Sequence, residues 1–213
     1  MKQLQLNLKE MSKICLFGAS GHGKVVRDIA VNSNIEVEVF IDDKPKSKFI
    51  DTIPVVEFKE LSKYESNKFI ISIGNNHVRK VISEKIKMKY TSLIHNTAII
   101  SPSVNISEGT VVMAGVLINV DSNIGKHAVI NTAAIVEHDC NIGDFVHISP
   151  NATITGNVCI GEGTHIGAGA IVIPNIKIGK WATIGAGSII INDIPDYAVV
   201  VGNPGVIKKY NQK

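Results

Sequence analysis

The chain has 213 residues and a formal net charge of +3, which is enough sequence to bury a sizeable core in one large or two small domains. Because its lysines and arginines are scattered, the positive charge does not predict a nucleic-acid-binding surface. Its three cysteines lack metal-ligand spacing, and no apolar run is long enough for a membrane span or a signal peptide. We therefore expect a cytoplasmic protein with reduced cysteines and without a membrane or nucleic-acid partner.

The first part of the chain alternates predicted strands and helices. Residues 1–10 precede a second methionine, Met11, and are either a short extension or the product of an upstream start. Apolar runs bounded by glycine or polar clusters predict three strands, over residues 13–17, 37–41 and 68–73. A helix is predicted after the first strand, with one side formed by Val25, Val26, Ile29 and Ala30. A second helix begins near Val78, and the alternation predicts a small parallel α/β sheet.

A polar cluster follows each predicted strand, at residues 18–23 (GASGHG), 42–43 (DD) and 74–76 (GNN). Because the carboxyl ends of parallel strands meet at one edge of a sheet, we expect these clusters to form one pocket. The glycines and the helix N-terminus suit a phosphate, and Asp42 or Asp43 can accept hydrogen bonds from a ribose or a base. The turn has GxxGxG rather than GxGxxG spacing, so a ligand-free turn and a solvated acidic pair are the alternatives. Binding of a nucleotide is favoured, and its identity stays open.

From residue 100 onward an aliphatic residue returns at every sixth position. The series is Ile100, Ile106, Val112, Ile118, Ile124, Ile130, Val136, Ile142, Ile148, Ile154, Ile160, Ile166, Val172, Ile178, Ile184 and Ile190. Six is a multiple of the strand period of two but not of the helical 3.6, which indicates β structure. A hexapeptide repeat predicts a parallel β-helix whose coils stack around one core, in preference to an ordinary β-sandwich. Proteins with such prisms are mostly acyltransferases. The change of pattern near residue 95 divides the chain into two predicted domains, over residues 11–95 and 96–213.

The chemically dense stretch of the repeat is residues 131–151. His138 is flanked by Glu137 and Asp139, and a histidine beside carboxylates is a candidate general base. His147 follows nine residues later, which is half a coil of three hexads, so the two histidines lie on different faces. A face of about five residues spans about 16 Å, so one subunit cannot easily bring both onto one small substrate. Neighbouring subunits could, which suggests a C3 trimer with sites in the clefts between subunits.

Three small residues, Pro150, Ala168 and Ala186, share one hexad position and are 18 residues apart. They are expected to stack along one ridge that leaves room for a long, thin ligand. Cys140 is at an inward position and is interpreted as a packing residue. The other histidines are predicted as a solvated His77, a His95 at the domain boundary, and two prism-surface candidates for the cleft, His127 and His165.

Taken in order, several motifs resemble those of the bacterial nucleotide-sugar acetyltransferases, a family that includes the UDP-4-amino-sugar N-acetyltransferase of bacillosamine synthesis and the NeuD-type sialic acid O-acetyltransferases. The motifs are Gly18–Gly23, Asp42-Asp43, Gly74-Asn75-Asn76, Ile94-His95 and Glu137-His138-Asp139-Cys140. The resemblance covers residues 13 to about 207 and implies a homotrimer with a Rossmann-like N-terminal domain and a β-helix that binds acetyl-CoA. It also implies left-handed coils, which depart from the usual right-handed crossover rule.

The resemblance assigns roles to individual residues. His138 matches the general base and Asp139 the acidic residue that raises its basicity. The family's positions that contact acetyl-CoA correspond to His147, Ala168 and Ala186 in this chain. The family's positions that hold the nucleotide sugar correspond to Ser20, Gly21, His22, Asp42, Asp43 and Gly74. Two positions depart from the pattern: Ala186 stands where some relatives have glycine, and Gly205 replaces the usual alanine of the terminal Gly-Asn-Pro-Ala motif.

The expected reaction is N-acetylation of the C4 amine of a UDP-linked 4-amino-4,6-dideoxy sugar, by direct attack on the acetyl-CoA thioester. Sialic acid O-acetylation and GDP-perosamine N-acetylation need the same base and groove and stay open. An NAD-dependent oxidoreductase is disfavoured by the turn spacing and by the absence of a catalytic Tyr-Lys pair or cysteine near the turn. A non-catalytic β-helix is disfavoured by the histidine–acid pair and the ridge. No cluster of histidine, cysteine and acidic residues suggests a metal.

Overall fold

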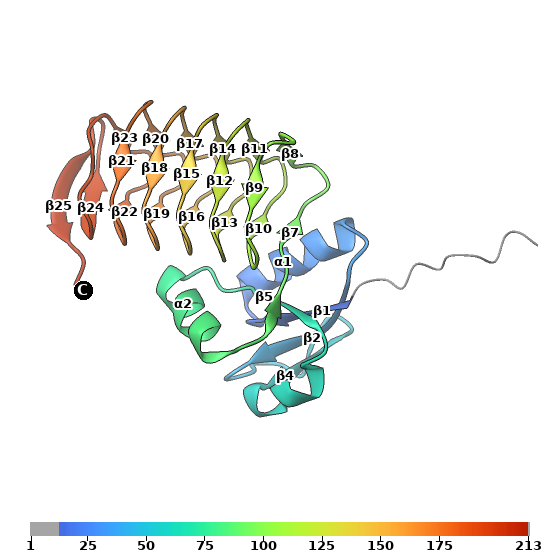
Figure 1. Cartoon of the computed structure of the whole chain (residues 1–213). Coiled ribbons are helices and arrows are strands. Elements are labelled where there is room, and N and C mark those ends of the chain that lie inside the picture. Colours follow the sequence, from blue (N-terminus) through green and yellow to red (C-terminus); the bar gives the residue numbers. More distant parts are fainter. Residues whose placement is uncertain (1–12, 213) are drawn as a thin grey trace, which may run out of the picture.

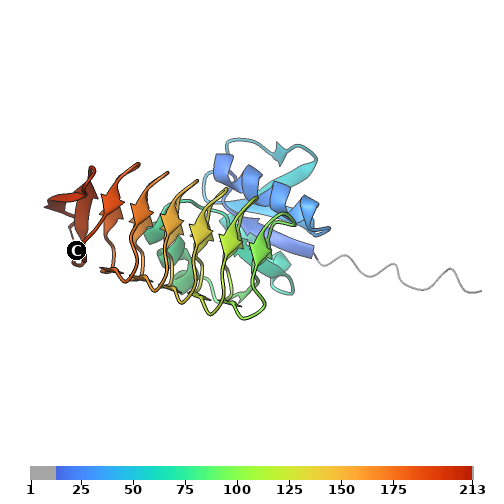
Figure 2. The same ribbon diagram turned by 90° about the horizontal axis from the view of Figure 1, so that it is seen from above.

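The computed structural model describes residues 13–212 and shows two parts, an α/β domain and a triangular prism of stacked coils (Figure 1). Residue 11, where the first predicted domain begins, and the extension suggested for residues 1–10 lie outside the described residues. The α/β domain lies against one side of the prism near its first coils, and a C-terminal hairpin closes the opposite end (Figures 1 and 2).

The α/β domain is built on a six-stranded sheet with the strand order β3-β4-β2-β1-β5-β6. The strands are β1 (Lys13–Phe17), β2 (Glu36–Asp42), β3 (Phe49–Ile50), β4 (Ile53–Glu57), β5 (Lys68–Ile71) and β6 (Lys89–Tyr90). The ladders from β4 through β6 are parallel and the β3–β4 hairpin is antiparallel, which confirms the predicted parallel sheet. Ser72 and Ile73, predicted as strand, instead form the bend after β5, where the Ser72 hydroxyl donates to the carbonyls of Phe17 and Gly18.

The domain's helices are α1 (Gly21–Asn32), the 3₁₀ helix η1 (Phe58–Tyr64) and α2 (Asn76–Lys85). On this side of α1 the positions Val26, Ile29 and Ala30 are buried, whereas Val25 lies at its edge and is 44% exposed. Positions i, i+3 and i+4 share one stripe of a helix, and the residue just before them projects to the side. The buried stripe joins a core that both parts share, together with Leu16, Phe40, Leu93, Val111 and Val129.

The prism has three faces, each a parallel sheet to which every coil adds one strand. The eight-stranded face contains β7 (Leu93–Ile94), β10 (Val111–Val112), β13 (Val129–Ile130), β16 (His147–Ile148), β19 (His165–Ile166), β22 (Thr183–Ile184), β24 (Ala198–Val201) and the antiparallel β25 (Val206–Tyr210). The six-stranded face contains β8 (Ile99–Ile100), β11 (Leu117–Ile118), β14 (Ile135–Val136), β17 (Thr153–Ile154), β20 (Ile171–Val172) and β23 (Ile189–Ile190). The five-stranded face contains β9 (Asn105–Ile106), β12 (Asn123–Ile124), β15 (Asn141–Ile142), β18 (Cys159–Ile160) and β21 (Lys177–Ile178).

The six-residue period fills the prism. The second residue of most two-residue strands points inward, and the small residue four positions later fills the corner, so that one apolar cluster runs along the prism. Cys140 belongs to this cluster at 1% exposure and its thiol contacts the carbonyl of Thr155, which agrees with the predicted packing role. Most corners turn through a residue with positive φ, either a glycine or a residue such as Asp139 (φ 60°).

The three faces differ in what their outward side chains offer. On the eight-stranded face Leu93, Val111 and Val129 are buried beneath the α/β domain. The five-stranded face presents mostly polar residues, namely Asn105, Asn123, Asn141, Cys159 and Lys177. The six-stranded face presents a mostly apolar row, namely Ile99, Leu117, Ile135, Thr153, Ile171 and Ile189, with Ile99 68% exposed. We call this row the apolar column.

The first coil of the prism begins with β7, and the turn between β24 and β25 closes the last coil. β7 already pairs with β10, so the coils begin at Leu93, three residues before the expected domain start at 96. At the other end residues 202–205 form the turn between β24 and β25, and the Gly205 N–H donates to the carbonyl of Ile189. A Cβ on Gly205 would lie 2.7 Å from Cδ1 of Ile190, which explains glycine instead of the usual alanine.

Candidate active site

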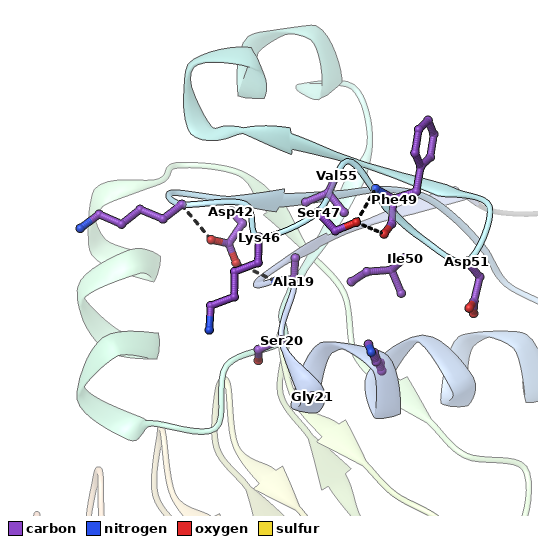
Figure 3. A pocket seen from close by; sticks show the side chains of 12 residues that line it. Ala19, Ser20, Gly21, Asp42, Lys46, Ser47, Phe49, Ile50, Asp51 and Val55 are labelled. Atoms are coloured by element: carbon purple, nitrogen blue, oxygen red, sulfur yellow. Dashed lines mark hydrogen bonds between the residues drawn. The ribbon is translucent and has the colours of Figure 1, made fainter.

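A pocket of about 530 Å³ opens at the carboxyl end of the α/β sheet (Figure 3). Its floor is the Gly-rich turn, at Ala19, Ser20 and Gly21, and one wall is the loop after β2. Gly18 has a φ of +113°, and a Cβ on Gly23 would lie 2.3 Å from the Gly18 carbonyl oxygen, so α1 can start this close to β1 because both are glycine. The turn therefore exposes the backbone of the α1 N-terminus to the pocket.

Asp42 lines this pocket and ties its two walls together. Its Oδ2 accepts from the N–H of Ala19 and its Oδ1 from the N–H of Lys44, each at 2.9 Å (Figure 3). A carboxylate oxygen keeps a second lone pair, so a ribose or base contact is still available to Asp42. The neighbouring Asp43 is exposed and does not line the pocket.

Three lysines that the sequence analysis missed also line the pocket: Lys24 on α1, and Lys44 and Lys46 on the loop after β2. Together they place positive charge opposite the helix N-terminus, which suits a diphosphate. A sequence signal existed, because Lys44 and Lys46 lie within three residues of the acidic pair, but scattered lysines elsewhere in the chain conceal it.

The remaining predicted substrate contacts, His22 and Gly74, lie on the prism side of the turn instead of in this pocket. The third polar cluster points toward the prism because α2, which starts there, docks on the eight-stranded face. Asn75 caps α2 by accepting from the N–H of Val78, and the Asn76 amide donates to the carbonyls of Gly163 and Thr164. The structure therefore divides the three clusters between a pocket and a domain interface.

Arg79 holds this interface and was not predicted from the sequence. Its side chain is 1% exposed, and burial lowers its pKa to about 9. Among the described residues its guanidinium donates to backbone carbonyls from both parts, those of His127, Ile73, Gly74, Phe145 and Val146. Lys80 adds an ion pair with Glu162 of the prism at 2.5 Å.

His147 bridges the α/β domain and the prism. Its Nδ1 lies 3.2 Å from the Gly74 carbonyl and its Nε2 lies 3.0 Å from Nδ2 of Asn131. An amide nitrogen donates, so Nε2 accepts, and Nδ1 carries the proton that is donated to Gly74. Burial lowers the pKa of His147 to about 3, so the ring is neutral near pH 7. The ring of His22 lies 6.3 Å from that of His147, and its Nε2 is buried with no partner among the described residues.

His138 lies elsewhere, at the corner between the six-stranded and five-stranded faces. Its side chain is 55% exposed, and its Nδ1 lies 2.8 Å from Oδ2 of Asp139. Glu137 points to a different partner, because its carboxylate accepts from the Asn119 amide at 2.8 Å. The predicted base therefore has one acidic partner and an open side toward solvent.

The predicted ridge lies at the opposite edge of the six-stranded face. Ala168 and Ala186 are exposed, and successive coils are in register because Gly169 donates to the carbonyl of Pro150 and Gly187 to that of Ala168. The six-stranded face thus has His138 along one edge and the ridge along the other. In one chain these two halves of the predicted site are separated by the width of that face.

One of the minor histidine predictions needs correction. His127 is 4% exposed, with its ring stacked on Phe145 and edge-on to Tyr90. It lines no open cleft, because the α/β domain covers the face where it lies. His77 is exposed, as predicted, and its ring lies edge-on to that of Trp181 with 5.9 Å between the ring centroids. His165 pairs with Ser149, and His95 bonds Thr97 at the first bend of the prism.

Within residues 13–212 no group of three or more His, Cys, Asp or Glu side chains could hold a metal ion. Over the same residues no helix is long and apolar enough to cross a membrane.

Comparison with known proteins gives matches to both parts of the chain. Residues 13–86 match the PglD N-terminal domain, and residues 157–192 match the bacterial transferase hexapeptide family of six repeats. The UDP-N-acetylbacillosamine N-acetyltransferase of Bacillus subtilis (strain 168) is 44% identical over 108 residues, 46% of this chain and 50% of that one. Uncharacterized protein L142 of Acanthamoeba polyphaga mimivirus is 33% identical over 98 residues, 45% of this chain and 20% of that one. The chain thus spans half or less of these curated relatives.

Solved structures match over almost the whole chain. One is a mutant of perosamine N-acetyltransferase from Caulobacter crescentus, with one histidine replaced by asparagine, in complex with CoA and GDP-perosamine. It is 34% identical, with 93% of this chain and 98% of that chain covered and a TM-score of 0.90. Another is the acetyltransferase domain of PglB from Neisseria gonorrhoeae FA1090 with acetyl coenzyme A, which is 38% identical over 92% and 98% of the two chains with a TM-score of 0.87.

These matches and the geometry define a hexapeptide-repeat transferase with a Rossmann-like domain and a left-handed parallel β-helix, which confirms the predicted fold. The chain belongs to the bacterial nucleotide-sugar acetyltransferases of the PglD type.

Proposed function

We propose that the chain is an acetyl-CoA-dependent N-acetyltransferase that acetylates the C4 amine of a UDP-linked 4-amino-4,6-dideoxy sugar. The Bacillus relative acts on a UDP-linked bacillosamine, and the Caulobacter and Neisseria structures hold CoA or acetyl-CoA. The observation that carries the proposal is the combination of a lysine-lined pocket in the α/β domain with a histidine–aspartate pair and a ridge of small residues on the two edges of one prism face.

The apolar column supports a homotrimer. A row of exposed and half-buried aliphatic side chains is unfavourable in water, and the parts of the predicted site on its two edges favour a second copy of the chain as the partner that covers it. Around a threefold axis, opposite edges of neighbouring copies meet, because a cyclic interface joins two different surfaces. The His138 edge of one subunit would then face the ridge of the next, together with its α/β domain. Packing of the apolar columns around the axis completes the site that one chain leaves divided.

In this trimer each substrate would bind to a different part of the shared site. The nucleotide diphosphate would lie in the lysine-lined pocket on the α1 N-terminus, with its sugar directed toward the His138 of the neighbouring subunit. Acetyl-CoA would lie along the ridge, against the backbone at Ala168 and Ala186. The predicted roles of His22 and Gly74 require the sugar to reach from the pocket to the prism side of the turn, and the predicted role of Asp43 requires a contact at the exposed loop after β2.

The residues support direct acyl transfer. Asp139 accepts from Nδ1–H of His138, which leaves Nε2 to take a proton from the C4 amine as the nitrogen attacks the thioester carbonyl. The carbon–sulfur bond breaks and CoA leaves as its thiolate. His147 has its only N–H engaged with Gly74, so a backbone N–H is the better donor to the oxyanion.

The role of His138 has a direct test. Because general-base catalysis contributes about 10²–10⁴-fold, His138→Ala should lower kcat by that factor in an assay of CoA thiol release. Gel filtration should show the same assembly as the unaltered chain. Full activity of the variant would remove His138 from the base role.

The same assay identifies the acceptor. We expect thiol release with a UDP-linked 4-amino sugar, and none with free sialic acid. The second candidate is GDP-perosamine, because the Caulobacter enzyme matches 93% of this chain. Preference for the GDP-linked sugar would replace the proposed substrate, and no release with any amino sugar would reject the N-acetyltransferase.

A further inference from the structure

One glycine of the prism lies directly against His138. The corner between the six-stranded and five-stranded faces carries one residue per coil at the same hexad position: Pro102, Val120, His138, Gly156, Pro174 and Asn192. Gly156 thus stacks one coil after His138, and the N–H of Asn157 donates to the His138 carbonyl at 2.9 Å, which fixes the two coils in register.

Gly156 leaves space that the imidazole of His138 occupies. A Cβ on Gly156 would lie 2.6 Å from Cε1 and 2.7 Å from Nε2 of that ring, closer than real Cβ atoms approach. The backbone does not demand a glycine here, because Gly156 is not among the residues with positive φ. Proline and valine occupy the same corner position in neighbouring coils, so the corner accepts side chains. The absence of a side chain at position 156 therefore makes room for the His138 ring and is not required by the backbone of the coil.

The ring has few other restraints. His138 is 55% exposed, and its hydrogen bond to Asp139 joins two side chains that both face solvent. A surface pair of this kind holds a rotamer weakly, because water competes for both partners. A close-packed surface under one edge of the ring adds a second restraint, which selects the orientation of Nε2.

We propose that Gly156 is a positioning residue that seats the His138 imidazole in its working orientation, an inference that rests on the proposed role of His138 as base. A side chain at position 156 would push the exposed ring outward, away from Asp139 and from the acceptor amine. Displacement of a catalytic group by about 1 Å can cost about 10²-fold in rate.

The test is Gly156→Ala, assayed by CoA thiol release. We expect kcat to fall about 10–100-fold, less than in His138→Ala, with KM for the nucleotide sugar nearly unchanged because the lysine-lined pocket is distant. The Tm should stay the same or rise slightly, since the ring can rotate into solvent and alanine restricts the unfolded chain. Pro102→Ala, at the same corner position three coils before Gly156, is the matched control and should keep the unaltered kcat.

A double-mutant cycle separates this inference from the proposed function. In the His138→Ala background, Gly156→Ala should cause no further loss of the residual rate, because the ring it displaces is gone. An equal loss in both backgrounds, or an unaltered kcat for Gly156→Ala, overturns the positioning role while leaving the base role intact. Full activity of His138→Ala overturns the base role instead. If Gly156→Ala fails to fold, recovery of folding in the double variant supports the ring contact, and failure of both variants contradicts it.

Discussion

Arg79 is a buried cation that binds backbone carbonyls from both parts of the molecule. Its donors reach the Gly74 segment on one side and the coils around His127 and Phe145 on the other. A planar guanidinium can serve several carbonyls in fixed directions, which a lysine ammonium cannot. The same contacts fix Gly74, whose carbonyl accepts from His147. This one side chain therefore joins the α/β domain to two coils of the prism.

We expect Arg79→Met to lower the free energy of unfolding by more than about 3 kcal/mol, because several buried carbonyls would lose their donor. Arg79→Lys should recover only part of the loss. Urea denaturation measures both variants. Arg27→Met is the control: this arginine pairs with exposed Asp28 and Asp51, so its loss should cost less than about 1 kcal/mol. An Arg79→Met variant no less stable than Arg27→Met would contradict the stabilising role of Arg79 at the interface.

At the scale of the elements, the interface between α2, the Gly-rich turn and the eight-stranded face is rich in neutral imidazoles. Burial lowers the pKa of His22 and His127 to about 4 and that of His147 to about 3. The charge of the nearby Arg79 is a further cause of all three lowered pKa values, whereas Glu108 and Asp144 partly oppose it at His127. The folded interface therefore resists taking up protons that the unfolded chain accepts.

This predicts acid instability in a defined pH window. Between about pH 6.5 and pH 4 the unfolded histidines are protonated and the buried ones are not, so stability falls by up to about 1.4 kcal/mol per pH unit for each imidazole. Above pH 6.5 both states are neutral and the effect vanishes. The Tm measured from pH 8 to pH 5 should fall accordingly.

His127→Phe is the control variant for this effect. Nδ1 of His127 has no hydrogen-bond partner among residues 13–212, so a phenyl ring should keep the stacking with Phe145 without losing stability at pH 8. Its Tm should depend less on pH than that of the unaltered chain. An equal pH slope would show that His127 does not contribute.

The prism, taken as a whole molecule, separates three functions onto three faces. The eight-stranded face carries the α/β domain and the five-stranded face is polar, and we propose that the apolar column of the six-stranded face packs against other copies of the chain. We expect Ile135→Glu to give particles with the mass of one 22.9-kDa chain instead of three, and to abolish activity. Lys177→Glu on the five-stranded face should change neither, and light scattering after gel filtration measures the mass. A trimeric and active Ile135→Glu variant would place the interface elsewhere.

The six-residue period predicted the prism, its register and the stacked ridge, because every coil repeats the same local rule. No repeated pattern predicts the contacts between segments that are far apart in the sequence. Arg79 is one charged residue on a short helix, and its partners come from coils some 50 to 70 positions away. His127 looked like a surface position because nothing in its hexad shows that another domain covers that face. Gly156 could have been found, since it is one period of 18 residues after His138.

The most direct measurement of a site shared between subunits is complementation. His138→Ala lacks the base, and Gly21→Phe would fill the nucleotide pocket, where a Cβ on Gly21 meets nothing within 4 Å. Each variant alone should be nearly inactive. After denaturation and refolding of an equal mixture, random trimers should recover about a quarter of the unaltered activity, because about half the bases face an intact pocket of a neighbour about half the time. A mixture as inactive as its two components would contradict the shared site.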